Sequence, residues 1–186
     1  MKSTGEVLGI AGTMEEALYK GMIAAGYYMK RNGGILISVR DTDKKDLKEL
    51  AKAYVSMGFT IYATEGTARK LNSAGISSTI VKKPKEADEG EETTISVMEK
   101  GRISYVLSTS VTGRQPDRDS VRLRRKAVEL GIPCLTSLDT AAVLALSLES
   151  KYDEDNVELI DIAHIVHGAA DQDEARQIKN AEEIHI

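Results

Sequence analysis

The strongest constraint on the fold is an alternation of short apolar runs with segments of helical periodicity, repeated five times between residues 35 and 148. A short apolar run bounded by polar turns is typical of a strand that is buried on both faces. The alternation therefore predicts an α/β fold: a three-layer, doubly wound, mostly parallel sheet of about five strands flanked by helices. The predicted strands are residues 35–39, 59–63, 78–81, 105–107 and 132–135.

The helices between these strands are predicted from residue spacing and from end signals. Asp43 is a candidate cap for a helix whose apolar stripe includes Leu47 and Tyr54, and Gly58 would end that helix. The segment 138–148 is almost wholly apolar, which predicts a buried helix. The remaining predicted helices span residues 67–74, 93–100 and 119–130, and the last of these is rich in arginine.

The chain divides by composition into an N-terminal arm, a body that carries the strands, and an acidic C-terminal extension. In the arm, Thr13 and Glu16 have the spacing of a capping box, at the start of a helix expected over residues 13–30. The three sections are residues 1–32, 33–150 and 151–186.

The net charge of −4 hides an asymmetry between these sections. The extension carries ten acidic and three basic side chains, so the first 150 residues carry net +3. This bias is too weak for nucleic-acid binding, which usually needs a basic stripe interleaved with aromatic residues. It is compatible with a body that binds a small anion.

The composition favours a cytoplasmic protein without a membrane segment. No run reaches the ~18 consecutive apolar residues of a membrane span, and residues 1–6 have no apolar core of a secretory signal. Cys134 is the only cysteine, so no intramolecular disulfide can form and a reducing compartment is the simplest interpretation.

Polar and basic side chains follow the predicted strands at the points where they end. Because ligands of open α/β sheets bind beyond the carboxyl ends of the strands, these five loops are expected to meet at one site. Hydroxyls, ammonium groups and free helix-start amides are what a phosphate needs, although any single hydroxyl here also suits a helix cap. The loop residues are Ser38, Arg40, Asp41, Lys44, Thr64, Gly66, Thr67, Lys82, Lys83, Lys85, Ser108, Thr109, Ser110, Thr112, Gly113, Arg114, Thr136 and Ser137.

The residues that catalysis would need are scarce in the body. All three histidines lie in the extension, and Asp119 and Asp139 stand at expected helix starts, where the helix dipole accounts for them. No nucleotide-binding glycine motif is present. We therefore assign no catalytic residue, no metal site and no cofactor.

Several short motifs follow one another in a fixed order between residues 3 and 165. They are Ser3-Thr4-Gly5-Glu6-Val7, Gly34-Ile35-Leu36-Ile37-Ser38-Val39-Arg40-Asp41, Gly58-Phe59, Ala63-Thr64-Glu65-Gly66-Thr67-Ala68, Asp119-Ser120, Arg124-Arg125-Lys126-Ala127 and Thr136-Ser137. In order and spacing they resemble the C-terminal allosteric domain of the carbamoyl phosphate synthetase large subunit. Residues 84–93 and 108–113 depart from that family's pattern.

This resemblance implies a methylglyoxal-synthase-like fold that binds a mononucleotide effector, such as UMP or IMP, and works with the catalytic part of the synthetase. The process regulated would be carbamoyl phosphate synthesis for the pyrimidine and arginine pathways. Asp119 and Ser120 would lie near the nucleotide's sugar and base, and Thr136 near an ornithine site. The residues implied around the effector phosphate are Ser38, Lys44, Thr64, Thr67, Lys83, Ser108, Thr109 and Ser110, beside Gly66, which lets backbone amides approach closely.

Two other functions remain open. The fold would also permit a free-standing methylglyoxal synthase, a lyase acting on dihydroxyacetone phosphate, although the histidine and the Gly-Gly-Asp segment of that family are missing from the expected positions. The chain could instead be an interaction or oligomerisation subunit that binds no effector. Self-assembly into a homo-oligomer is compatible with each of these functions.

Overall fold

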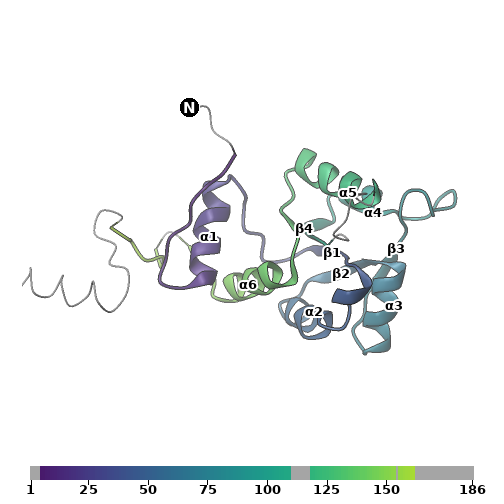
Figure 1. The fold of residues 1–186 in the computed structure, drawn as a ribbon, viewed down its shortest axis with the longest axis horizontal. Coiled ribbons are helices and arrows are strands. Elements are labelled where there is room, and N and C mark those ends of the chain that lie inside the picture. Colours follow the sequence, from purple (N-terminus) through teal and green to yellow (C-terminus); the bar gives the residue numbers. More distant parts are fainter. Residues whose placement is uncertain (1–4, 110–117, 154, 162–186) are drawn as a thin grey trace, which may run out of the picture.

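The computed structural model describes residues 5–109, 118–153 and 155–161. Its centre is a five-stranded, wholly parallel sheet in the order β3-β2-β1-β4-β5 (Figure 1). The strands are β1 (Gly34–Ser38), β2 (Thr60–Thr64), β3 (Thr79–Val81), β4 (Ile103–Ser108) and β5 (Cys134–Leu135). Each strand overlaps its predicted apolar run, so the predicted α/β fold is confirmed.

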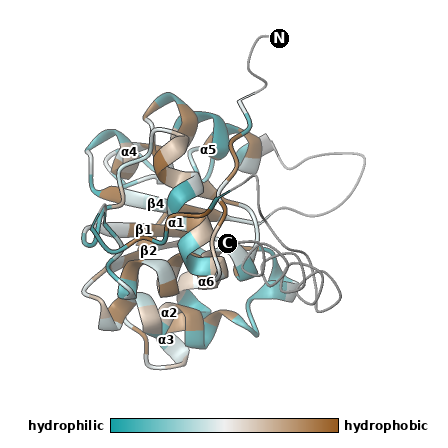
Figure 2. Ribbon diagram, turned by 90° about the vertical axis from the view of Figure 1, so that its left-hand side faces the viewer, coloured by the Kyte–Doolittle hydropathy of each residue, from teal (hydrophilic) through white to brown (hydrophobic). Residues whose placement is uncertain are grey.

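Helices cover both faces of this sheet, with α4 and α5 on one side and α2, α3 and α6 on the other (Figure 2). The side chains of β1 alternate between two apolar cores, because Ile35 and Ile37 pack on the α2 and α6 side while Leu36 packs on the opposite side. The helices are α1 (Met14–Ala24), α2 (Leu47–Ser56), α3 (Glu65–Ser73), α4 (Thr94–Glu99), α5 (Arg118–Glu129) and α6 (Leu138–Glu149).

Helix α1 is shorter than the segment 13–30 that the sequence predicts. Gly26 has φ +82°, the left-handed conformation that commonly ends a helix. Its amide donates to the carbonyl of Ile23 at 2.9 Å, and the amide of Tyr27 donates to that of Met22 at 3.0 Å. These two bonds close the last turn, so the predicted helix end was wrong.

The predicted capping box at α1 forms only in part. The Thr13 hydroxyl accepts a hydrogen bond from the Glu16 amide at 3.4 Å. The Glu16 carboxylate instead accepts from the Lys20 ammonium at 2.9 Å and from the Glu158 amide at 2.6 Å. Lys20 also donates to the carbonyl of Ile10 at 2.9 Å. Helix α1, which lies against α6 beside the sheet, thus holds segments from both ends of the described chain (Figure 1).

Asp43 does not cap a helix as predicted. It closes a short 3₁₀ turn, Asp41–Asp43, and its carboxylate accepts from the Arg40 guanidinium at 2.8 Å. Helix α2 begins later, at Leu47, with Asp46 as its N-cap residue. The Asp43 carboxylate, which was expected to cap α2, therefore forms an ion pair with Arg40 of the preceding loop.

Helix α6 is buried on one side only. Leu144 and Leu148 lie in the core as predicted, whereas Leu146 is 52% exposed. The prediction of a buried helix is therefore wrong for the face that carries Leu146. Although α6 is rich in apolar residues, no helix in the described part of the chain has the length and apolar character needed to cross a membrane.

Candidate functional site

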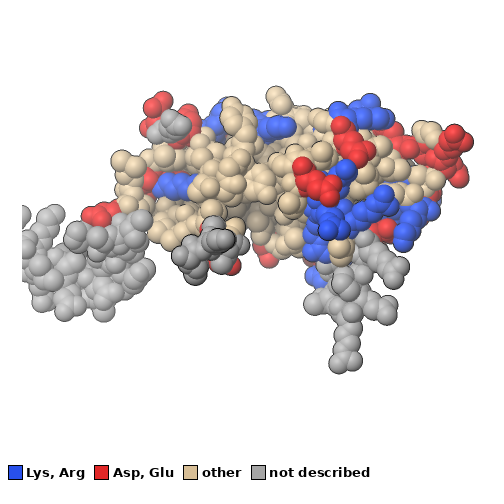
Figure 3. Space-filling model, turned by 90° about the horizontal axis from the view of Figure 1, so that it is seen from above, with Lys and Arg blue, Asp and Glu red and all other residues tan. Residues whose placement is uncertain are grey.

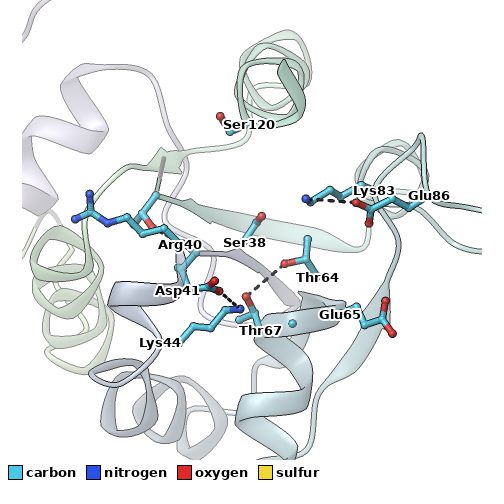
Figure 4. A pocket seen from close by; sticks show the side chains of 13 residues that line it. Ser38, Arg40, Asp41, Lys44, Thr64, Glu65, Thr67, Lys83, Glu86 and Ser120 are labelled. Atoms are coloured by element: carbon cyan, nitrogen blue, oxygen red, sulfur yellow. Dashed lines mark hydrogen bonds and ion pairs between the residues drawn. The ribbon is translucent and has the colours of Figure 1, made fainter. Parts of the chain in front are cut away.

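A pocket of about 390 Å³ lies at the carboxyl ends of the strands. It sits where the chain leaves β1 toward α2 on one face and β4 toward α5 on the other, the switch point at which open α/β sheets bind ligands. Four strand ends and the first turn of α5 contribute to its wall. The lining residues are Ser38, Val39, Arg40, Asp41, Lys44, Thr64, Glu65, Gly66, Thr67, Lys83, Glu86, Thr109 and Ser120 (Figure 4).

Two lysines bring positive charge to opposite sides of the pocket. The ammonium of Lys44, whose side chain is 19% exposed, lies 2.6 Å from the Asp41 carboxylate. The hydrogen bond from Lys44 holds the pKa of the Asp41 carboxyl below its ordinary value. The Lys83 ammonium lies 3.5 Å from the Glu86 carboxylate and points toward the pocket (Figure 4).

The start of helix α3 forms the floor between these lysines. Thr64 is the N-cap residue, yet its hydroxyl makes no capping bond and donates instead to the Thr67 hydroxyl at 3.4 Å. The first amides of a helix have no acceptor within the helix and carry partial positive charge. Two hydroxyls and the amide end of α3 therefore face the pocket together.

Glu65 lines the same pocket but its carboxylate points away from it (Figure 4). It pairs with the guanidinium of Arg69 and, at 3.4 Å, with the ammonium of Lys82. Arg69 and Lys82 hold the pKa of the Glu65 carboxyl below its ordinary value. Its negative charge is thus directed to these two cations and away from the pocket.

Thr109 ties the loop after β4 to the loop after β1. Its hydroxyl accepts a hydrogen bond from the Arg40 amide at 3.1 Å. Burial works against ionisation of Asp43, but hydrogen bonds from Arg40, Thr109 and Thr42 outweigh it and keep the pKa of the Asp43 carboxyl below its ordinary value. The pocket wall between β1 and β4 is therefore cross-linked by polar contacts.

The buried end of β4 carries a second hydroxyl. Ser108 is wholly buried, and its Oγ has no hydrogen-bond partner among the described residues. On the facing helix, Ser120 is buried as well, and the Arg124 guanidinium donates to its Oγ at 3.3 Å. A buried hydroxyl that lacks a partner carries a free-energy cost, which a ligand or a water molecule can relieve.

Most residues predicted for the site are brought together. Those that line the pocket are Ser38, Lys44, Thr64, Gly66, Thr67, Lys83, Thr109 and Ser120. Ser108 and Asp119 directly precede lining residues but are not part of the lining, and Thr136, exposed just after β5, does not line the pocket either. Ser110 lies outside the described residues.

Three lining residues were not among the loop residues expected to meet at the site: Val39, Glu65 and Glu86. Arg40 and Asp41, which follow β1 directly, were expected among these loop residues but not among those implied around the effector phosphate. Glu86 stands three residues after Lys83, and this spacing places its carboxylate beside the ammonium.

The chemistry of the lining favours binding of an anion over proton transfer. A carboxylate that acts as a general base near neutral pH needs a raised pKa, whereas the pKa values of Asp41 and Glu65 are lowered. Among the described residues, no group of three or more histidine, cysteine, aspartate or glutamate side chains could hold a metal ion.

Comparison with known proteins matches about half of the chain to a family model. Residues 46–136 match the model of the MGS-like domain, a stretch that includes Thr64, Gly66, Thr67 and Lys83 but not Lys44. Among solved structures, methylglyoxal synthase from Elizabethkingia anophelis NUHP1 aligns with 17% sequence identity and a TM-score of 0.48. That alignment covers 62% of this chain and 78% of the synthase chain.

Proposed function

We propose that this chain is a regulatory domain that binds a phosphorylated small molecule in the pocket at the carboxyl ends of its strands. The observation that carries the proposal is the convergence of the Lys44 and Lys83 ammonium groups on the start of α3, where Thr64 and Thr67 add hydroxyls. A phosphate is recognised by this combination of cations, hydroxyls and helix-start amides.

The ion pairs of the two lysines do not prevent such binding. Asp41 is 93% exposed and Glu86 is also exposed, so each pair is screened by water and holds its lysine only weakly. A phosphate dianion between the lysines would offer both a stronger partner in a more enclosed position. The ammonium groups can therefore turn from their carboxylates to the ligand.

The ligand proposed is a mononucleotide, such as UMP or IMP. A pocket of about 390 Å³ has room for more than a phosphate, and it continues from the helix start toward Ser120 on α5. The resemblance to the allosteric domain of carbamoyl phosphate synthetase supports an effector of this class, and the match to the MGS-like domain is compatible with it and with the lyase alternative.

The partner proposed is the catalytic part of a carbamoyl phosphate synthetase, whose output for pyrimidine and arginine synthesis the effector would tune. Regulation of this kind requires that the effector bind one conformation of the assembly better than another, typically by ~1–3 kcal/mol. The chain by itself would then bind the effector without converting it.

The proposal is tested by calorimetric titration of the chain with inorganic phosphate, UMP, IMP and ornithine, next to an assay for consumption of dihydroxyacetone phosphate. We expect saturable mononucleotide binding and no turnover. Turnover of dihydroxyacetone phosphate would instead identify a lyase, and failure of every phosphate compound to bind would leave an interaction subunit.

A pair of variants assigns the binding to this pocket. Lys83→Ala removes a lining ammonium and should weaken binding about tenfold or more, because a charge-assisted hydrogen bond is worth ~1.5–3 kcal/mol. Lys85→Ala removes an exposed charge of the same loop that does not line the pocket, and it should leave affinity nearly unchanged. Equal effects of the two variants would exclude Lys83 as a specific ligand.

A further inference from the structure

A groove of about 510 Å³ runs between helices α2 and α6, on the face of the sheet opposite to α4 and α5. Its floor is apolar and its rim is acidic. The apolar lining residues are Leu50, Ala53, Leu138, Ala142, Ala145 and Leu146, and the acidic ones are Asp46, Glu49, Asp139 and Glu149. We call this feature the acidic groove.

The acidic groove leaves apolar surface uncovered. Ala142 and Leu146 lie one turn apart on α6 and are both exposed, Leu146 by 52%. No lysine or arginine is found among the described residues that line the groove, although exposed Lys52 pairs with Glu49 at 3.0 Å and Lys45 lies 4.0 Å from Asp46. The lining itself is acidic, so the rim favours basic partners over acidic ones. An apolar helix face flanked by basic side chains has the chemistry that this groove fits.

Helix α5 carries a face of that kind. Val121 and Val128 are 46% and 69% exposed, and Arg122 and Arg125 are exposed on the same side of the helix. Glu129 is exposed beside the two arginines, and its carboxylate pairs with the Lys126 ammonium at 3.5 Å. Within the part of the chain that the structure describes, neither arginine forms an ion pair. We call these four residues the basic face.

Basic side chains gather around this part of the molecule. Figure 3, which views the molecule from above relative to Figure 1, shows them toward its right-hand end, interspersed with acidic side chains. Lys126 adds to the positive charge although it pairs with Glu99 at 2.9 Å. The surface around the basic face is therefore suited to an acidic docking site.

The acidic groove and the basic face lie on opposite sides of the sheet, so they cannot meet within one molecule (Figure 2). We propose that the basic face of one copy of this chain docks into the acidic groove of a second copy. The two valines would cover the exposed apolar floor around Leu146. The two arginines would reach the carboxylates of the rim, of which Glu49 and Glu149 are the most suitable for testing because they stand on different helices.

This contact has a characteristic geometry. Each copy offers one basic face and one acidic groove, so a docked pair still has one of each free. Such head-to-tail contacts close into a ring or continue as a chain, and the assembly grows with protein concentration. Because charged groups at the rim are screened by salt, self-association should also weaken as ionic strength rises.

The test is analytical ultracentrifugation of the whole chain over a concentration series. The proposal predicts reversible association, and it predicts that Arg122→Glu/Arg125→Glu and Glu49→Lys/Glu149→Lys each weaken it about tenfold or more through like-charge contact. Lys70→Glu/Lys85→Glu makes the same change in net charge as the arginine variant at exposed positions outside both surfaces, and it should associate like the original chain.

A mixture of the two variants provides the decisive experiment. Mixing the arginine variant with the glutamate variant should restore association, because the glutamates on α5 of the first can dock into the groove lysines of the second. The unchanged basic face of the second can likewise dock into the unchanged acidic groove of the first. Circular dichroism of every variant checks that the fold is retained. A chain that stays monomeric at all concentrations, or variants whose mixture associates no better than either alone, would overturn the proposal.

Discussion

The ammonium of Lys44 lies directly against Gly66, in the first turn of helix α3. A β-carbon added to Gly66 would come within 2.8 Å of Lys44 Nζ, closer than real β-carbons approach another heavy atom, and nothing else lies so near. The absence of a side chain at Gly66 thus lets Lys44, from the loop after β1, approach the amide end of α3.

Replacing Gly66 by alanine should lower phosphate affinity without lowering the free energy of unfolding. The methyl group displaces the flexible end of Lys44, so phosphate affinity in a calorimetric titration should fall about tenfold, in the range of one lost charge-assisted hydrogen bond. The free energy of unfolding should stay the same or rise by up to ~1 kcal/mol, because alanine favours a helix more than glycine does. Lys70→Ala, at an exposed position of α3, serves as the control and should leave affinity unchanged.

Ser108→Ala is expected to weaken binding without weakening the fold. The buried Ser108 hydroxyl has no partner among the described residues, so its removal should leave the free energy of unfolding unchanged or raise it by about 1 kcal/mol. Ser108 directly precedes the lining residue Thr109, so a phosphate that enters this end of the pocket can take its hydroxyl as a donor, and phosphate affinity should fall in the variant. Ser147→Ala is a matched control, because Ser147 is another buried hydroxyl without a described partner and lies on α6, outside the pocket. Loss of affinity in both variants, or in neither, would contradict a role for Ser108.

The sheet and the position of the site could be predicted because both depend on short-range patterns. The apolar run around Ile35 and Ile37 indicates a buried strand by itself, and parallel strands bring their carboxyl ends to one edge. Lys44, Thr64 and Lys83 therefore converge whatever the details of the loops. The prediction needed only the order of strands and helices along the chain.

The helix ends and the individual side-chain contacts could not be predicted, because each depends on which of several nearby groups a residue pairs with in the folded chain. Gly26 ends α1 through its backbone conformation although the apolar spacing continues beyond it. Asp43 is of a residue type that often caps helices, but its carboxylate accepts a hydrogen bond from the Arg40 guanidinium instead. The contact between Lys44 and Gly66 joins the loop after β1 to the start of α3 and is fixed only once β1 and β2 pair.

The Glu16 carboxylate is predicted to make stability depend on acid pH. Hydrogen bonds from Lys20 and from the Glu158 amide hold the pKa of the Glu16 carboxyl below its ordinary value of 4.5. A carboxyl whose pKa is lower in the folded state stabilises the fold above the unfolded value, and this contribution is lost as pH falls through the folded pKa. Glu16→Gln should therefore lower the thermal midpoint at neutral pH, and the difference from the original chain should shrink once the pH is well below 4.5.

Thermal unfolding at neutral and acid pH checks this expectation, with Glu15→Gln as the control. Glu15 is the neighbouring carboxylate in α1 and forms no ion pair with a described residue, so its replacement should have little effect at either pH. Hydrogen exchange adds a local readout, because the neutral amide oxygen of glutamine is a weaker acceptor than the carboxylate, and the Glu158 amide should therefore be less protected in Glu16→Gln. A midpoint difference that is the same at both pH values would show that the charge of Glu16 is not what stabilises this contact.

Tyr54→Phe should weaken the attachment of α2 to α6. The Tyr54 hydroxyl, on a wholly buried side chain, donates to the carbonyl of Ala141 at 2.8 Å. Phenylalanine fills nearly the same space but removes this bond, and a neutral hydrogen bond contributes ~0.5–1.5 kcal/mol to the free energy of unfolding. Denaturant titration should show a loss of about 1 kcal/mol with an unchanged slope, because the surface exposed on unfolding stays the same. Tyr62→Phe is the control, because Tyr62 is half-buried and its hydroxyl forms no hydrogen bond with a described residue. This change should lower the free energy of unfolding by much less. Equal losses in the two variants would rule out the hydrogen bond to Ala141 as the cause.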